Sequence, residues 1–150
     1  MENVIVSSKS DDFIGDIAKK VLNNNNFSEI IINKYSDFYS LEIKYTFANS
    51  NKTAEEYDSM IKDELTKIFN QIKDYKIKNN QIFGANDDEI KQEIALSFYY
   101  PKENGNKSYL ASSRIRYTAE KGFDVSVYES ELNKTIVTDE KIEDAKKRSY

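Results

Sequence analysis

The segment EIALSFYYPKENGNKSYLASSRIRY, residues 93–117, contains two alternating apolar stretches joined by Asn104-Gly105. Asn-Gly predicts a type I′ turn between antiparallel strands, because that turn requires a positive φ at both central positions. We therefore expect strands over Gln92–Tyr100 and Lys107–Thr118. In the register that this turn sets, the facing pairs of one side are Ile94–Ile115, Leu96–Ser113, Phe98–Ala111 and Tyr100–Tyr109.

A third strand is expected over Phe123–Glu129, after the connection TAEKGF. This connection suits a three-residue loop with Gly122 in the left-handed conformation and a bulge. Tyr117 would then face Val125, and Ile115 would face Val127. A two-residue loop would instead place Thr118 against Phe123 and mismatch the two faces of the sheet.

The opposite, more polar face of these strands holds Arg114 and Arg116, two of only three arginines in the chain. The expected register places Arg116 between Glu93 and Ser126, and Arg114 between Ala95 and Tyr128. In a purely structural interpretation, Arg116 pairs with Glu93 and Arg114 stacks on Tyr128. Alternatively, the face binds a partner, since Tyr and Arg are enriched at interface hot spots. The candidate binding residues are Arg114, Arg116, Tyr99, Tyr128 and Glu93, with Leu110 and Asp124 expected on the same face.

The preceding sequence supplies two helices and two further strands. Apolar residues spaced along one stripe from Phe13 to Leu22 predict a helix that ends at the Asn23–Asn26 run. Strands are expected over residues 27–35 and 39–47, the second with strict alternation. Residues 53–76 predict a helix that opens with Thr53 and Glu56 in capping-box spacing. A frayed helix or tail follows at 138–150.

These elements give the order α-β-β-α-β-β-β in a single domain, residues 1–150, with loosely ordered ends at 1–9 and 138–150. The order predicts an α+β, two-layer fold, in which helices pack on one face of an antiparallel sheet.

Composition removes several classes of function. The chain has no Cys and no His, which excludes Ser-His-Asp and Cys-His nucleophiles and the usual zinc sites. Its net charge of −4, with Lys, Asp and Glu intermixed, argues against nucleic-acid binding. The isolated glycines form no phosphate loop, and no apolar run is long enough for a membrane span. We therefore predict no cofactor and no catalytic activity.

Two acidic groups have side chains that could serve as metal ligands. Residues 86–89, NDDE, cluster oxygen atoms but lack the ligand spacing of an EF-hand. Asp11, Asp12 and Asp16 suit the first turn of a helix, where the helix dipole favours negative charge. Neither group predicts a metal site.

Residues 93–130 resemble the C-terminal sheets of small extracytoplasmic lipoproteins of Gram-positive bacteria with cystatin-like or NTF2-like folds. The resemblance rests on the order of strands, small residues and turns. It implies a helix packed on a curved antiparallel sheet and an origin as a lipoprotein ectodomain. It carries over no catalytic residues, and the lipid-attachment Cys of such proteins has no counterpart here.

Two functions from different classes are consistent with these features. The first is a non-catalytic binding or accessory domain of an envelope-associated protein, extracytoplasmic if an N-terminal signal was removed. The alternative is a cytoplasmic acidic chaperone or immunity-type inhibitor, dimeric, that masks a partner protein. A third hypothesis is an enzyme with a carboxylate-based site behind the sheet. The first two imply a protein partner, and a homodimer is compatible with either.

Overall fold

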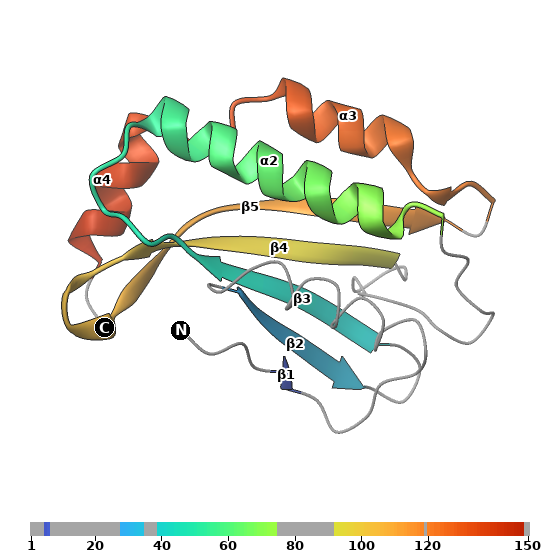
Figure 1. The fold of residues 1–150 in the computed structure, drawn as a ribbon, viewed down its shortest axis with the longest axis horizontal. Helices are drawn as coiled ribbons and strands as arrows, with labels where there is room; N and C mark the ends of the chain where they lie inside the picture. The colour runs from blue at the N-terminus through green and yellow to red at the C-terminus, as the bar shows by residue number, and fades with distance from the viewer. Residues whose placement is uncertain (1–4, 7–27, 35–38, 75–91, 119, 149–150) are drawn as a thin grey trace.

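The computed structural model describes residues 5–6, 28–34, 39–74, 92–118 and 120–148 (Figure 1). The predicted helix at 13–22, the NDDE segment and Asp11, Asp12 and Asp16 lie outside these residues. The elements are β1 (Ile5–Val6), β2 (Ser28–Lys34), β3 (Tyr39–Thr46), α2 (Ala54–Ile72), β4 (Gln92–Pro101), the 3₁₀ turn η1 (Glu103–Gly105), β5 (Lys107–Thr118), β6 (Gly122–Phe123), α3 (Val125–Asn133) and α4 (Asp139–Lys147).

The strands form one mixed sheet in the order β1-β2-β3-β4-β5-β6. The pairs β2–β3, β4–β5 and β5–β6 are antiparallel, as expected. The predicted all-antiparallel sheet is nevertheless wrong, because β3 and β4 run parallel, as do β1 and β2. Between β3 and β4 the chain passes through α2, and a crossover of this kind returns the second strand in the direction of the first. The α+β class is confirmed.

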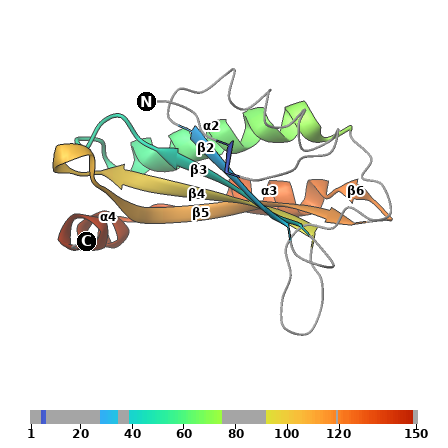
Figure 2. The ribbon, with the colours of Figure 1, turned by 90° about the horizontal axis from the view of Figure 1, so that it is seen from below.

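The α2 helix begins with the predicted capping box. Thr53 Oγ1 accepts the backbone N–H of Glu56 at 3.1 Å, and Glu56 Oε1 accepts that of Thr53 at 3.0 Å. The helix buries one apolar stripe, formed by Tyr57, Ile61, Leu65, Ile68, Phe69 and Ile72. This stripe belongs to the same core as Phe47, which follows β3, and the inward side chains of the sheet, which include Ile43, Ile94, Leu96, Phe98 and Ile115. Figures 1 and 2 show α2 and α3 along one face of the sheet.

The β4–β5 hairpin has the predicted turn. Asn104 has φ 60° and Gly105 has φ 77°, and the backbone N–H of Asn106 donates to the carbonyl of Glu103 at 3.2 Å. The pairs Ile94–Ile115, Leu96–Ser113 and Phe98–Ala111 are confirmed.

Nearer the turn, the predicted pair Tyr100–Tyr109 is wrong, because Tyr100 faces Ser108. The register shifts between Phe98 and Tyr99, where β5 carries the extra residue Leu110. Lys102 is a compensating extra residue on the β4 side, since Pro101 already pairs with Lys107. The bulge turns the apolar side chain of Leu110 inward, so that it is 3% exposed and does not lie on the polar face as expected.

Replacing Gly105 by Ala tests the turn. We expect the free energy of unfolding to fall by about 1–2 kcal/mol, because a side chain disfavours positive φ. A Cβ at this position would meet nothing within 4 Å, so the loss reports backbone conformation alone. Asn106→Ala is the control, since Asn106 has φ −74°. Equal stability of the two variants in urea unfolding would contradict the assigned turn.

The long third strand that we predicted is wrong. The left-handed conformation of Gly122, with φ 73°, is confirmed, but Gly122 pairs with Thr118 in β6 and does not lie in the loop as expected. However, β6 ends at Phe123, which faces Tyr117 in place of Val125. Asp124 then starts α3: its Oδ1 accepts the hydroxyl of Ser126 at 2.7 Å and the backbone N–H groups of Ser126 and Val127 at 2.9 and 3.3 Å. These bonds, led by that of the Ser126 hydroxyl, hold the pKa of Asp124 below its ordinary value.

Residues 139–147 form α4, which lies beside the hairpin end of β4 and β5 (Figure 2). Thr138 caps its start, and Ile142 and Ala145 are buried. At its end, Lys102 Nζ donates to the carbonyls of Lys146 and Arg148. A cation is favourable at that position because the C-terminus of a helix carries partial negative charge. No helix in the described part of the chain has the length and apolarity of a membrane span.

Candidate functional site

The candidate site is the face of β4 and β5 that points away from α2, which we call the outer face. Alternate residues of each strand form the outer face, because successive side chains of a strand point to opposite sides of a sheet. Ile94, Leu96, Phe98 and Ile115 are buried beneath α2, and the residues between them point outward. The outer face comprises Glu93, Ala95, Ser97, Tyr99, Lys107, Tyr109, Ser112, Arg114 and Arg116.

Both arginines bind the same oxygen of Glu93. Arg114 Nη1 lies 2.9 Å from Glu93 Oε1, and Arg116 reaches it with Nη2 at 3.0 Å and Nε at 3.3 Å. The predicted cross-strand pairs Glu93–Arg116 and Ala95–Arg114 are therefore correct. One carboxylate cannot neutralise two guanidinium groups, each of which has five N–H donors. Because the Arg114 side chain is 43% exposed and that of Arg116 is 28% exposed, their remaining donors can reach a second carboxylate.

Tyr128 does not lie with the other candidate residues. It belongs to α3, where its ring stacks on Phe69 of α2 with the centroids 4.1 Å apart and the planes 5° apart. Its hydroxyl donates to Thr66 Oγ1 at 2.9 Å. The expected stacking of Arg114 on Tyr128 is thus wrong, because the chain turns into a helix on the α2 side of the sheet. Ser126 likewise is not a cross-strand neighbour of Arg116.

The outer face also contains an aromatic pair: Tyr99 lies there as predicted, and Tyr109, which we expected opposite Tyr100 on the other side of the sheet, faces it. Tyr99 and Tyr109 meet edge to face, with centroids 6.1 Å apart. Lys107 Nζ lies 4.9 Å from the centre of the Tyr99 ring, and Lys44 Nζ lies 5.6 Å from it. Tyr109 is 41% exposed, and the guanidinium of Arg148 lies 5.7 Å from its ring. Cations placed over aromatic faces in this way attract the rings and fix their orientation.

Charge is unevenly distributed on this part of the molecule. On the outer face, Lys107, Arg114 and Arg116 are cationic and Glu93 is the only carboxylate. Arg148 of the α4 end adds a fourth cation. The adjacent strand β3 contributes one charge of each sign, Lys44 and Glu42, and Glu42 Oε2 accepts the hydroxyl of Ser97 at 2.6 Å. A cationic surface thus lies on a chain whose net charge is −4.

Glu131 is the buried carboxylate on the described part of the chain. One of its oxygens accepts the hydroxyl of Ser113 at 2.8 Å, and the other lies 2.5 Å from Lys134 Nζ. Both oxygens therefore have partners: the bond from Ser113 holds α3 against β5, and the pair with Lys134 lies at the C-terminal end of α3 itself. Among the described residues, no three acidic side chains gather in a way that could hold a metal ion.

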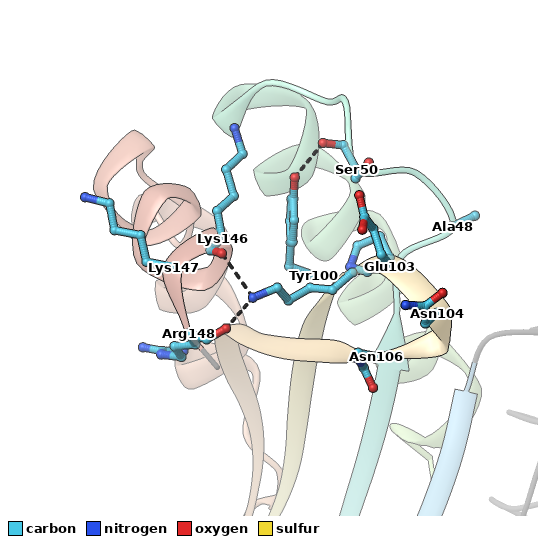
Figure 3. A pocket seen from close by; sticks show the side chains of 11 residues that line it. Ala48, Ser50, Tyr100, Glu103, Asn104, Asn106, Lys146, Lys147 and Arg148 are labelled. Carbon is cyan, nitrogen blue, oxygen red and sulfur yellow. Dashed lines mark hydrogen bonds between the residues drawn. The ribbon is translucent and has the colours of Figure 1, made fainter. Parts of the chain in front are cut away.

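A broad open hollow of about 960 Å³ lies between the hairpin and the end of α4 (Figure 3). Its polar groups serve the fold: the Tyr100 hydroxyl donates to the carbonyl of Ser50 at 2.7 Å, and Lys102 binds the carbonyls that end α4. The donors of Tyr100 and Lys102 in this hollow are therefore engaged in connecting the hairpin to residue 50 and to the end of α4.

No protein-family model, curated protein or solved structure matches the chain. Its function must therefore be inferred from the geometry of its own residues.

Proposed function

We propose that the protein is a non-catalytic binding module that uses the outer face to bind an acidic segment of a partner protein. The observation that carries this proposal is the sharing of one Glu93 oxygen by Arg114 and Arg116. This arrangement leaves excess positive charge and exposed donors on the same face as the pair of Tyr99 and Tyr109. Bidentate binding of a carboxylate by Arg is strong and directional, and Tyr supplies apolar contact at small entropic cost.

An acidic protein segment fits this surface better than a nucleic acid does. Binding to nucleic acid depends on the neutralisation of many phosphates, usually by an extended basic face. Four cations on a chain with net charge −4 provide little of that attraction. They match a short peptide that presents two or three carboxylates.

We also propose the type of protein to which this binding module belongs and its cellular location. Both an envelope-associated accessory domain and an inhibitor that masks its partner would bind a protein, so either could use the outer face. We favour the extracytoplasmic accessory domain with a cystatin-like or NTF2-like fold. Helices packed on one face of the sheet support that assignment, although the parallel β3–β4 pair departs from the antiparallel arrangement that the resemblance implies.

The test is binding of fluorescein-labelled poly-L-glutamate, measured by fluorescence anisotropy at low and high salt. We expect the double variant Arg114→Gln/Arg116→Gln to weaken binding by about tenfold or more, which corresponds to about 1.4 kcal/mol. Lys67→Gln/Lys73→Gln, which removes the same charge from exposed positions of α2 and its C-cap, should bind as the wild type does.

Equal weakening in the two double variants would mean that net charge alone governs binding, and the proposal would fail. Tighter binding to single-stranded DNA than to poly-L-glutamate would reject an acidic protein as the partner.

A further inference from the structure

The outer edge of β5 exposes backbone groups that can accept another strand. The backbone N–H of Asp124 donates to the carbonyl of Arg116 at 2.8 Å, so this carbonyl points away from β4. In an antiparallel pair, the backbone groups of alternate residues point to the same side of the strand. The N–H and C=O of Arg114 and Ser112 therefore also point away from β4.

This stretch of edge is closed at both ends. At one end, β6 and Asp124 cover Thr118 and Arg116. At the other, Arg148 Nη1 donates to the carbonyl of Tyr109 at 2.5 Å. Between these two ends, the outward N–H and C=O groups of Ser112 and Arg114 have no hydrogen-bond partner among the described residues. Ser112 is itself an exposed residue.

A hollow of about 360 Å³ lies along the same stretch. Ser112 and Arg114 line it from β5, Ala95 and Ser97 from the outer face of β4, and Glu131 and Lys134 from α3 and its C-terminal end. An unpaired edge of this kind is a template for strand addition, in which backbone bonds give affinity and adjacent pockets give specificity. The hollow provides space for side chains of an added strand.

We propose that the acidic segment binds in an extended conformation as an additional strand on β5, bonding to the backbone groups of Ser112 and Arg114. This inference rests on the proposed function and specifies its mode. The exposed guanidinium of Arg114 lies at the docking edge and receives a carboxylate of the segment. Charge favours this occupant over a second copy of the chain, because β5–β5 pairing would bring the arginines of two copies onto one continuous sheet, where like charges repel.

The test uses a synthetic peptide of alternating Glu and Val residues. We expect it to slow hydrogen exchange of the Ser112 and Arg114 amides in NMR spectra of the wild-type protein. Ser112→Pro should weaken binding by about tenfold or more, because it removes an outward N–H that the β4 ladder does not use. Ser112→Ala keeps that N–H and should bind as the wild type does.

Two modified peptides provide a test that does not depend on the folding of any variant. One carries N-methyl groups on its Glu residues and the other on its Val residues. Only alternate N–H groups of an added strand face β5. We therefore expect one modified peptide to lose binding and the other to retain it.

The outcomes separate the mode of binding from the proposed function. If Arg114→Gln weakens binding while Ser112→Pro and both modified peptides bind normally, strand addition is wrong and the proposed function stands. Binding of poly-L-glutamate without binding of the alternating peptide would likewise reject strand addition and leave the proposed function standing. If neither probe binds, both proposals fail. A dimer in sedimentation that Ser112→Pro dissociates would assign the edge to a second copy and overturn the inference.

Discussion

Replacing Phe98 by Ala is expected to lower the free energy of unfolding by about 3–5 kcal/mol, the usual cost of truncating a buried Phe. Phe98 lies on β4 and is 1% exposed. Its ring lies beside Tyr45 of β3 and Phe47, which directly follows β3, with centroid distances of 5.8 and 6.0 Å. Truncation would leave a cavity bounded by the strands and α2, and urea unfolding followed by circular dichroism measures the loss.

Tyr99→Ala is the matched control, because the neighbouring side chain points to the outer face. Its loss should be limited to the contacts on the outer face, about 0.5–1.5 kcal/mol for the ring pair with Tyr109 and about 0.5–1 kcal/mol for each of Lys107 and Lys44. Comparable losses at Phe98 and Tyr99 would contradict the assignment of the two faces. A double-mutant cycle between Tyr45 and Phe98 adds a test of the parallel β3–β4 pair, in which these residues face one another. We expect a coupling of about 0.5–1.5 kcal/mol.

The parts of the fold that the sequence predicted are those with strong local signals. Asn104-Gly105 requires positive φ at two successive residues, and few other structures satisfy that requirement. The capping box of Thr53 and Glu56 similarly fixes the start of α2 within one turn. Each signal is contained in four residues, so it does not depend on the rest of the fold.

The direction of β4 relative to β3 depends on tertiary packing, and the alternation within either strand carries no information about it. The strand-helix-strand order was the available signal, since a helical crossover commonly joins parallel strands. The start of α3 was missed for a different reason. Val125 and Val127 alternate as in a strand, and only the position of Asp124 as an N-cap reveals the helix.

The sequence predicted only part of the candidate site, because only some of its contacts are set by local residues. Glu93 and Arg116 follow from the register of the hairpin, which local residues set. The contact between Tyr109 and Arg148 depends on the bulge at Leu110 and on the position of α4. Neither the bulge nor the position of α4 can be recognised in a single segment of the sequence, because both depend on how elements far apart in the chain bury their apolar side chains.

Asp58→Ala is expected to lower the free energy of unfolding by about 2–4 kcal/mol at neutral pH, since bonds to a charged group contribute about 1.5–3 kcal/mol each. Asp58 on α2 accepts the backbone N–H groups of Ile136 and Val137 at 2.6 and 2.9 Å, and Lys62 Nζ lies 2.8 Å from its second oxygen. It thereby fixes the connection between α3 and α4, where Ile136 and Val137 are buried. Removing the carboxylate would take this partner from the N–H groups of two buried residues. Asp63→Ala, at an exposed position of the same helix, should change stability little.

The pH dependence of the stability lost on replacing Asp58 tests whether its ionised carboxylate is the source of the stabilisation. Burial raises the pKa of Asp58, but the bond from Lys62, the two backbone N–H groups and the charge of Lys62 together outweigh burial and hold the pKa below its ordinary value of 3.8. The folded protein therefore favours the ionised form, and the stabilisation is present above pH 3.8 and is lost as the pH falls through the lower folded pKa. Asp58→Asn resembles the protonated side chain, so its stability deficit relative to the wild type should shrink as the pH is lowered from 7 to about 2. A deficit that stays constant across this range would show that the ionised carboxylate does not hold the connection in place.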